Sequence, residues 1–231
     1  MKKLFILLFS LLIQFMIVDA QVEKKGSETV LAWLPAIINH QMPDFTLPVF
    51  GGGEFTLSKN LGKNVLVVFP RGWIGTEWCQ LCHYQYTELL DMMNKQNLKD
   101  NLNLVVVFIL PYPIEKVADW VIKMPVNLSI IEQWKSGKND FSAYMRENYP
   151  VKYEVNTKEL SIPILVDGDT KLSKNLQLFT ESWDGVKAEQ NIPTVFLLDK
   201  TGKIRFKYHS QSTFDRPTAQ YLVTILKSII G

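Results

Sequence analysis

The sequence predicts an α/β fold in which helices flank a central mixed β-sheet, with an N-terminal β-hairpin extension and a partly helical insertion. Continuous runs of β-branched and aliphatic residues at 64–70 and 102–111 are typical of buried central strands. Segments with helical spacing follow both runs, and strands that alternate with helices indicate an α/β sandwich. A hairpin at 192–209 then adds antiparallel strands, which makes the sheet mixed.

The first half of the domain opens with a hairpin. Residues 45–49 and 54–57 alternate apolar and polar positions around three consecutive glycines, a pattern typical of two short paired strands. Strand 64–70 follows, and the segment 83–96 carries apolar residues near helical spacing. After the strand at 102–111 we expect a helix over 113–124, because Pro113 suits the first turn of a helix.

The second half repeats the strand–helix order before the sheet is completed. Residues 162–170 predict a third strand and a turn, and residues 171–179 predict a short helix. The two strands of the hairpin at 192–209 are joined at a Lys-Thr-Gly turn, and an amphipathic helix over 216–230 ends the chain. The polar segment 125–158 interrupts this alternation, so we interpret it as a partly helical insertion.

The N-terminus has the layout of a secretory signal peptide. Two lysines precede the apolar run 4–18, and Val18 and Ala20 are small residues flanking a cleavage position after Ala20. The apolar run is shorter than the roughly 20 residues that a membrane span needs. We therefore expect a signal peptide over 1–20, a leader over 21–40, and one domain over 41–231. This predicts a periplasmic or extracellular protein with no membrane span after cleavage.

The bulk composition excludes several classes of function. A content of 47% hydrophobic and 21% charged residues is that of a globular protein and not of a disordered one. A net charge of +2 indicates no nucleic-acid partner.

Two cysteines, Cys79 and Cys82, form a Cys-x-x-Cys motif directly before the helix at 83–96. A disulfide between them closes a very short loop and would constrain the unfolded chain little, so stability does not explain the pair. Cys-x-x-Cys after a buried strand is instead typical of a redox-active dithiol. A helix N-terminus favours a thiolate, so we expect Cys79 to be the nucleophile. Cys82, one turn later, would resolve the oxidised form, and His83, if charged, would stabilise the thiolate further.

These pieces together resemble the thioredoxin-like redoxin superfamily, which contains AhpC/TSA-type peroxiredoxins and exported TlpA/ResA-type thiol–disulfide oxidoreductases. The resemblance runs from about residue 43 to 208 through PDFTLP, FTLSKNLGKNVLVVFPRGW, WCQLCHYQYTEL, IPILVDGDTKLSKNL and IPTVFLLDKTGKI. It implies a thioredoxin-like fold with Cys79 as nucleophile and Cys82 as its partner. It also implies that Pro193 is a cis-proline that aligns the substrate opposite the dithiol.

Two departures from the family pattern bear on the reaction. The residues Ile74–Glu77 separate the Arg71-Gly72-Trp73 stretch from Trp78, so the loop before the nucleophile is longer. Within it, Thr76 stands three residues before Cys79, as the catalytic threonine of peroxiredoxins does, and is either a peroxide ligand or part of the loop surface. In peroxiredoxins, an arginine that helps to activate the thiolate commonly stands at the position that Pro193 occupies here. Arg71 either takes over that role or is a surface cation. The second departure favours disulfide exchange over dedicated peroxide reduction.

Three functions therefore remain open. The first is thiol–disulfide oxidoreduction, which needs no cofactor and whose partners are a disulfide or thiol substrate, either a protein or a small molecule, and a thiol redox partner. The second is hydroperoxide reduction by the same two cysteines. The third is non-enzymatic binding, either of a c-type haem through both cysteines and His83, or of copper through both cysteines and His209. Trp78, next to Cys79, would either line the substrate entrance in both redox reactions or pack in the core.

Overall fold

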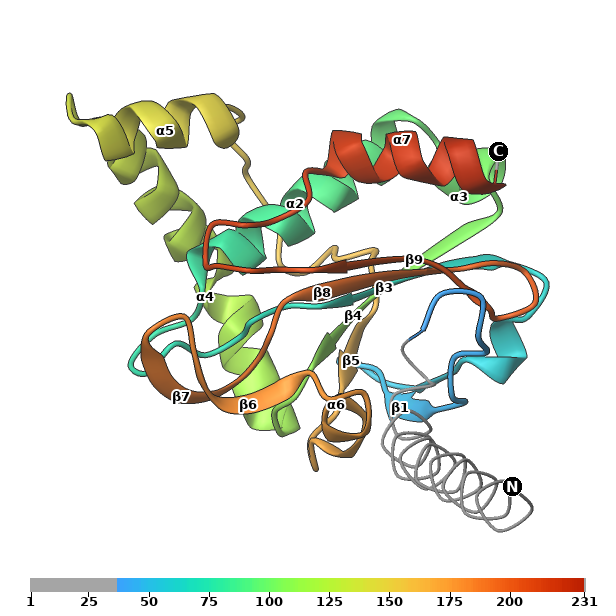
Figure 1. Cartoon of the computed structure of the whole chain (residues 1–231). Helices are drawn as coiled ribbons and strands as arrows, with labels where there is room; N and C mark the ends of the chain where they lie inside the picture. The colour runs from blue at the N-terminus through green and yellow to red at the C-terminus, as the bar shows by residue number, and fades with distance from the viewer. Residues whose placement is uncertain (1–36, 231) are drawn as a thin grey trace, which may run out of the picture.

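A five-stranded mixed sheet forms the centre of the computed structural model, which describes residues 37–230 (Figure 1). The central strand β3 (Asn64–Phe69) pairs in parallel with β4 (Leu104–Leu110) and antiparallel with β8 (Thr194–Leu198). On the outer sides, β5 (Ile164–Val166) is parallel to β4, and β9 (Ile204–His209) is antiparallel to β8. The expected mixed sheet is therefore confirmed.

Two further hairpins and a set of helices surround this sheet. The expected N-terminal hairpin is present as β1 (Thr46–Pro48) paired with β2 (Glu54–Thr56). A second hairpin joins β6 (Phe179–Trp183) to β7 (Val186–Asn191). The helical segments are a short 3-10 turn η2 (Ser58–Asn60), α2 (Gln80–Lys95), α3 (Leu98–Asn101), α4 (Ile114–Lys135), α5 (Asp140–Asn148), α6 (Lys171–Asn175) and α7 (Ala219–Ile230).

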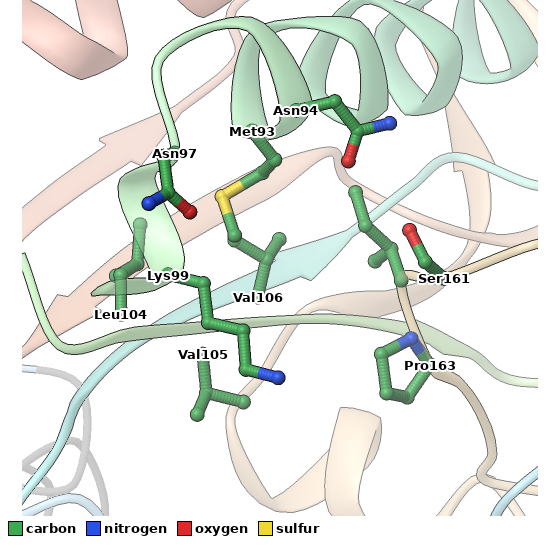
Figure 2. A pocket seen from close by; sticks show the side chains of 10 residues that line it. Met93, Asn94, Asn97, Lys99, Leu104, Val105, Val106, Ser161 and Pro163 are labelled. Carbon is green, nitrogen blue, oxygen red and sulfur yellow. The ribbon is translucent and has the colours of Figure 1, made fainter. Parts of the chain in front are cut away.

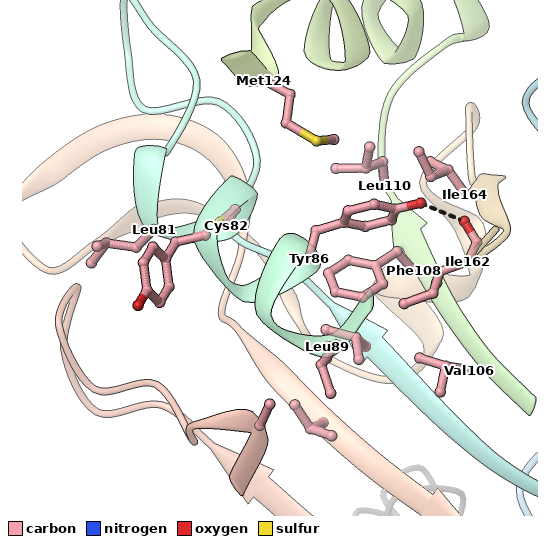
Figure 3. Packing of buried hydrophobic residues seen from close by; sticks show 14 of the residues in the cluster. Leu81, Cys82, Tyr86, Leu89, Val106, Phe108, Leu110, Met124, Ile162 and Ile164 are labelled. Atoms are coloured by element: carbon pink, nitrogen blue, oxygen red, sulfur yellow. Dashed lines mark hydrogen bonds between the residues drawn. The ribbon is translucent and has the colours of Figure 1, made fainter. Parts of the chain in front are cut away.

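The two faces of the sheet bury different elements. One face is covered by α2, α4 and α7, and Figure 3 shows how Tyr86 of α2 lies against Phe108 of β4 in this layer. The Tyr86 hydroxyl donates a hydrogen bond of 2.8 Å to the Ile162 carbonyl, so the buried ring has no unpaired polar atom. The other face is covered by the β1–β2 hairpin and α6. Both faces are apolar, which explains why the β3 and β4 segments read as unbroken hydrophobic runs.

Three predicted elements differ from the structure. The helix expected to end at residue 124 continues through Pro125 to Lys135, because Met124, Leu128 and Ile131 carry its buried face onward. The segment 125–158 thus contains the second half of α4 and all of α5. The helix expected over 171–179 ends at Asn175.

We did not predict the β6–β7 hairpin from the sequence. Its strands are mostly partly or fully exposed, so they lack the apolar alternation that marks a half-buried strand. A local signal was present in Asp184-Gly185, because both residues have positive φ, as the turn of a two-residue hairpin requires.

The expected signal peptide at 1–20 and nearly all of the leader at 21–40 lie outside the described residues. Between residues 37 and 230, no helix has both the length and the hydropathy needed to cross a membrane.

Candidate active site

The two cysteines lie where β3 leads into α2. Cys79 is the N-cap of α2, as the sequence predicts, and its backbone N–H donates to the Gly72 carbonyl at 2.9 Å. Cys82 lies one turn later on the same helix. Both are free thiols, and both are buried, with 1% and 0% of their surfaces exposed. The pair is therefore held at the end of the central strand, inside the protein.

The two thiols differ in acidity. A hydrogen bond from the Cys82 thiol to the Cys79 sulfur lowers the pKa of Cys79, and the positive charges of Arg216 and Arg71 lower it further. Burial raises the pKa of Cys82, and the neighbouring Cys79 raises it again. Cys79 is thus the more acidic thiol of the pair and Cys82 the less acidic one.

Arg71 is a buried cation and not a surface one. It is 1% exposed, and its Nε donates to Gln190 Oε1 of β7 at 2.5 Å. One terminal nitrogen donates to Thr213 Oγ1 at 2.6 Å and the other to the Trp183 carbonyl at 3.3 Å. The guanidinium also lies 4.9 Å from the Trp183 ring centroid. The β6–β7 hairpin therefore holds this charge in place near the thiolate.

Arg216 is a second cation at the site, and our sequence reasoning did not identify it. It lies in the segment that connects β9 to α7, where one terminal nitrogen donates to the carbonyls of Ser212 (3.1 Å) and Asp215 (3.0 Å). Asp215 anchors this segment by accepting hydrogen bonds from the Tyr208 hydroxyl and the Gln211 backbone. No short motif marks Arg216, because its proximity to Cys79 depends on the folding of the last two elements.

The long loop before Cys79 is a tight turn closed by aromatic side chains. The Ile74 N–H donates to the Glu77 carbonyl at 2.8 Å, and the rings of Trp73 and Trp78 lie 4.9 Å apart. Trp78 is buried and donates from Nε1 to Asp119. Thr76 is exposed within this turn, whereas Cys79 is buried. The structure thus places Thr76 on the loop surface and Trp78 in the packed wall of the site.

His83 does not supply positive charge to the thiolate. Its ring is fully buried, with Nε2 2.9 Å from the Trp120 carbonyl and Nδ1 3.0 Å from Asn127 Nδ2. Burial lowers the pKa of His83 to about 3, so the ring is neutral. The condition under which His83 would stabilise the thiolate is therefore not met, because α4 covers the ring. With both nitrogens bonded inside the protein, His83 also does not fit the role of a haem axial ligand.

Pro193 precedes β8 in the trans form, so the expectation of a cis-proline is wrong. Its carbonyl accepts a hydrogen bond from the Ser210 N–H at 2.9 Å, and the Thr194 hydroxyl donates to the Ile192 carbonyl at 3.0 Å. The Ser210 bond continues the β8–β9 ladder by one residue, so Pro193 lies at the start of this strand pair, a position that suits a residue without an N–H.

The copper alternative lacks a ligand set. Within the described residues, no group of three or more histidine, cysteine, aspartate or glutamate side chains is close enough to hold a metal ion. His209 instead pairs its Nδ1 with the Thr194 hydroxyl at 2.8 Å.

A pocket of about 440 Å³ lies far from the dithiol (Figure 2). It is formed by the carboxyl end of α2, the following turn and the start of β4, and Figure 2 shows Met93, Lys99 and Ser161 around it. Since α2 has 16 residues, the pocket and Cys79 are separated by roughly the 24 Å length of the helix. This pocket is therefore not the site of thiol chemistry.

Comparison with known proteins identifies the family. The model of the AhpC/TSA family matches residues 38–207, which is most of the chain. This protein belongs to the AhpC/TSA family. No curated protein matches its sequence.

Several solved structures of AhpC/TSA-like proteins share its fold. Enterococcus faecalis AhpC is 14% identical with a TM-score of 0.54, over 83% of this chain and 90% of that one. A cysteine-to-serine mutant of Xylella fastidiosa PrxQ is 14% identical with a TM-score of 0.54, over 83% of this chain and 96% of that one. Peroxidoxin BcpB from Mycobacterium tuberculosis is 15% identical with a TM-score of 0.50, over 84% and 98%. The chain therefore has the thioredoxin-like redoxin fold.

Family membership and the dithiol together define the class of activity. The protein is a thiol-dependent oxidoreductase or peroxidase, and its substrates are those that react with thiols.

Proposed function

We propose that this AhpC/TSA protein reduces small hydroperoxides with Cys79 as the attacking thiolate and Cys82 as the resolving thiol. The observation that carries the proposal is the combination of a low-pKa thiolate, two neighbouring guanidiniums and near-complete burial. A hydroperoxide is small enough to enter a site in which Cys79 is 1% exposed, whereas a folded protein disulfide is not.

The proposed cycle balances without an organic cofactor. The Cys79 thiolate attacks the terminal oxygen of the hydroperoxide, so that an S–O bond forms and the O–O bond breaks. The leaving alkoxide takes up a proton to become an alcohol, and Cys79 becomes a sulfenic acid. Cys82 sulfur then attacks Cys79 sulfur, which forms the disulfide and releases water. A thiol reductant, the redox partner of the cycle, restores both thiols by exchange.

Arg71 and Arg216 counter the argument against peroxide reduction that we drew from the sequence. That argument rested on the proline that occupies the usual arginine position. Arg71 and Arg216 reach the thiolate from other segments, and both lower the pKa of Cys79. They would also favour the transition state in which the leaving oxygen gains negative charge.

Thiol–disulfide exchange is the second candidate, and the spacing of the cysteines favours it. Cys82 lies one helical turn from Cys79, within reach of a mixed disulfide formed on Cys79. In this reaction the Cys79 thiolate attacks a substrate disulfide, one substrate thiolate leaves, and Cys82 displaces the other. The turn at 72–78 would have to move away from Cys79 to admit a polypeptide substrate.

Stopped-flow oxidation of the reduced protein separates these candidates. Tryptophan fluorescence reports the reaction, since Trp78 adjoins Cys79. We expect hydrogen peroxide to oxidise the protein far faster than it oxidises a free thiol at the same pH. Cys79→Ser should abolish the reaction, and Cys82→Ser should stop it at the sulfenic acid. A peroxide rate equal to that of a free thiol, together with fast oxidation by a small disulfide, would make disulfide exchange the function.

We also propose that the protein is exported, on the basis of residues 1–20 alone. Mass spectrometry of the protein expressed at full length should find a mature N-terminus at Gln21. A chain that retains Met1 would contradict cleavage.

A further inference from the structure

One amide side chain of α4 contacts both ends of the Cys-x-x-Cys motif. Asn127 Nδ2 is 3.0 Å from the carbonyl oxygen of Trp78, the residue before Cys79. The same nitrogen is 3.0 Å from Nδ1 of His83, the residue after Cys82. A primary amide nitrogen carries two hydrogens and cannot accept, so Asn127 donates one hydrogen bond to each partner. The Asn127 side chain therefore bridges the motif from outside α2.

This bridge is buried in the contact between α2 and α4, which lie side by side at the start of α2 (Figure 1). Asn127 is 5% exposed, Trp78 is 2% exposed and His83 is 0% exposed. Water cannot easily replace a hydrogen bond that is lost in such surroundings, and a donor or acceptor left unpaired there is costly. The two bonds of Asn127 therefore hold their partners in place.

The bond to Trp78 fixes the peptide unit that precedes Cys79. The Trp78 carbonyl and the Cys79 N–H belong to the same planar peptide unit. Its N–H donates to the Gly72 carbonyl at 2.9 Å, and its carbonyl accepts from Asn127. The Cys82 N–H donates to the Cys79 carbonyl at 3.1 Å, so Asn127 supplies the donor that this turn of α2 does not give to the Trp78 carbonyl. The orientation of Cys79 at the N-cap therefore depends on Asn127.

Helix α4 holds each flank of the motif by a second hydrogen bond. The Trp78 indole Nε1 donates to Asp119 Oδ2 at 2.6 Å. The His83 ring donates from Nε2 to the Trp120 carbonyl at 2.9 Å. Asp119 and Trp120 lie about two turns before Asn127 on the same helix, so all four bonds come from one rigid element. The positions of residues 78 and 83 relative to each other are thus set by α4, and the two cysteines lie between them.

We propose that Asn127 is a positioning residue that holds Cys79 and Cys82 in the arrangement from which their disulfide closes. A disulfide forms only where the backbone brings two cysteines to a narrow range of separation and direction. A framework that presets this geometry raises the effective concentration of one thiol at the other. The inference goes beyond the proposed function, because the pair has to close whether a hydroperoxide or a disulfide oxidises it. It also gives a role to the second half of α4, where Asn127 lies.

Equilibration of the full chain with glutathione tests this role. Glutathione disulfide takes two electrons and two protons from the Cys79 and Cys82 thiols, which yields the protein disulfide and two molecules of glutathione thiol. Asn127→Ala removes both donors, and we expect the equilibrium constant of this reaction to fall about 5- to 10-fold, the effect of one lost hydrogen bond. His83→Leu keeps the bond to Trp78 and should lower the constant about two- to fivefold. This second variant keeps the test decisive if Asn127→Ala does not fold.

Lys135→Met is the matched control for a general loss of stability. Lys135 lies at the end of the same helix, is 8% exposed, and donates to the Val151 carbonyl at 3.2 Å. Its removal should lower the free energy of unfolding in urea. We expect the glutathione equilibrium constant of this variant to stay within about twofold of wild type, because Lys135 touches neither flank of the motif.

The outcomes separate the role of Asn127 from the proposed function. An unchanged constant in Asn127→Ala, an equal fall in Lys135→Met, or a larger fall in His83→Leu than in Asn127→Ala would overturn the role of Asn127. A wild-type protein in which glutathione disulfide produces no disulfide between the two cysteines would instead overturn the resolving role of Cys82 in the proposed function.

Discussion

His83 and Trp120 lie against each other at the contact between α2 and α4, with ring centroids 4.4 Å apart. His83 Nε2 is 2.9 Å from the Trp120 carbonyl, and Asn127 Nδ2 is 3.0 Å from His83 Nδ1. Because the amide nitrogen of Asn127 can only donate, Nδ1 must accept, and the ring proton is on Nε2. The neutral imidazole is therefore fixed in one tautomer by two bonds that join the helices.

The neutral state of His83 makes the stability of the fold depend on pH. Burial lowers the pKa of His83 to about 3 in the folded chain, whereas an unfolded histidine has a pKa of about 6.5. Below pH 6.5 the unfolded chain therefore binds a proton that the folded chain does not, and the free energy of unfolding falls as the pH falls toward 3. Above pH 6.5 the full stability is present.

Urea unfolding at pH 7 and pH 4 measures this effect. We expect the wild type to lose about 3 kcal/mol more between these pH values than His83→Gln, at about 1.4 kcal/mol per pH unit. His40→Gln replaces an exposed histidine and should behave as the wild type does. Equal pH dependence in wild type and His83→Gln would show that His83 accepts a proton in the folded state.

Arg216 should contribute to the reactivity of Cys79, beside the hydrogen bond from Cys82. Its positive charge lowers the pKa of Cys79, so Arg216→Gln should raise that pKa and reduce the thiolate fraction. The rate of alkylation by iodoacetamide, measured against pH, should have its midpoint below the ordinary thiol value of about 8.5 in wild type and closer to it in the variant. A rise of one pKa unit from about 6 should lower the rate about twofold at pH 7 and about tenfold at pH values well below 6, where the thiolate is the minor form.

Arg205→Gln is the control for this effect. Arg205 pairs with Asp199 on the surface, where its side chain is 43% exposed. Its removal should leave the alkylation profile unchanged. The same upward displacement of the midpoint in both variants would mean that net charge, and not the position of Arg216, controls Cys79.

Gly72 should tolerate no side chain. It has a φ of +83°, and a Cβ at this position would lie 2.4 Å from the ring of Tyr112. Tyr112 cannot move freely, since its hydroxyl accepts from the Trp73 N–H at 2.8 Å and donates to the Glu189 carbonyl at 3.1 Å. We expect Gly72→Ala to lower the free energy of unfolding by about 2–4 kcal/mol and to reduce activity.

Gly75→Ala isolates the contribution of backbone strain. Gly75 has a φ of +84°, but its Cβ would meet nothing within 4 Å. Its substitution should cost about 1–2 kcal/mol, the penalty of the left-handed backbone alone. Thermal or urea unfolding measures the loss of stability in both variants. Equal losses would show that the Tyr112 ring moves away from the added methyl group at no cost in free energy.

Replacing Pro125 should stabilise the protein. A proline inside α4 has no N–H for the helical bond to the Val121 carbonyl, and its ring crowds that turn. Pro125 is exposed, so no core packing is lost in Pro125→Ala. We expect the free energy of unfolding to increase by about 1–3 kcal/mol in urea unfolding. A decrease in the free energy of unfolding would mean that Pro125 stabilises the protein by restricting the unfolded chain more than it destabilises α4.

The sequence was sufficient to predict those elements that a continuous local pattern of residues identifies. β3 and β4 are buried on both faces, so their continuous apolar runs identify them. Cys79 could be placed at a helix start because the motif separates a strand pattern from a helix pattern. The proposed roles of Cys79 as nucleophile and Cys82 as resolving thiol rest on that placement.

The electrostatic surroundings of the dithiol could not be predicted in the same way. Arg71 is buried by Gln190 and Thr213, which are 119 and 142 positions away in sequence. No local pattern distinguishes such an arginine from a surface cation. The trans form of Pro193 and the neutral state of His83 likewise depend on partners from other elements, the Ser210 N–H and the α4 helix.

The distance along the chain between Arg71 and its partners also bears on biosynthesis. During translation Cys79 emerges more than a hundred residues before Gln190 and Thr213, and the partners that hold the Arg71 charge near its sulfur do not yet exist. In a nascent chain the contribution of the two arginines to the low pKa of Cys79 is therefore absent, and it arises only when the last hairpin and loop have docked. Completion of the fold is thus the event that brings both arginine charges to Cys79 and makes its thiol more acidic.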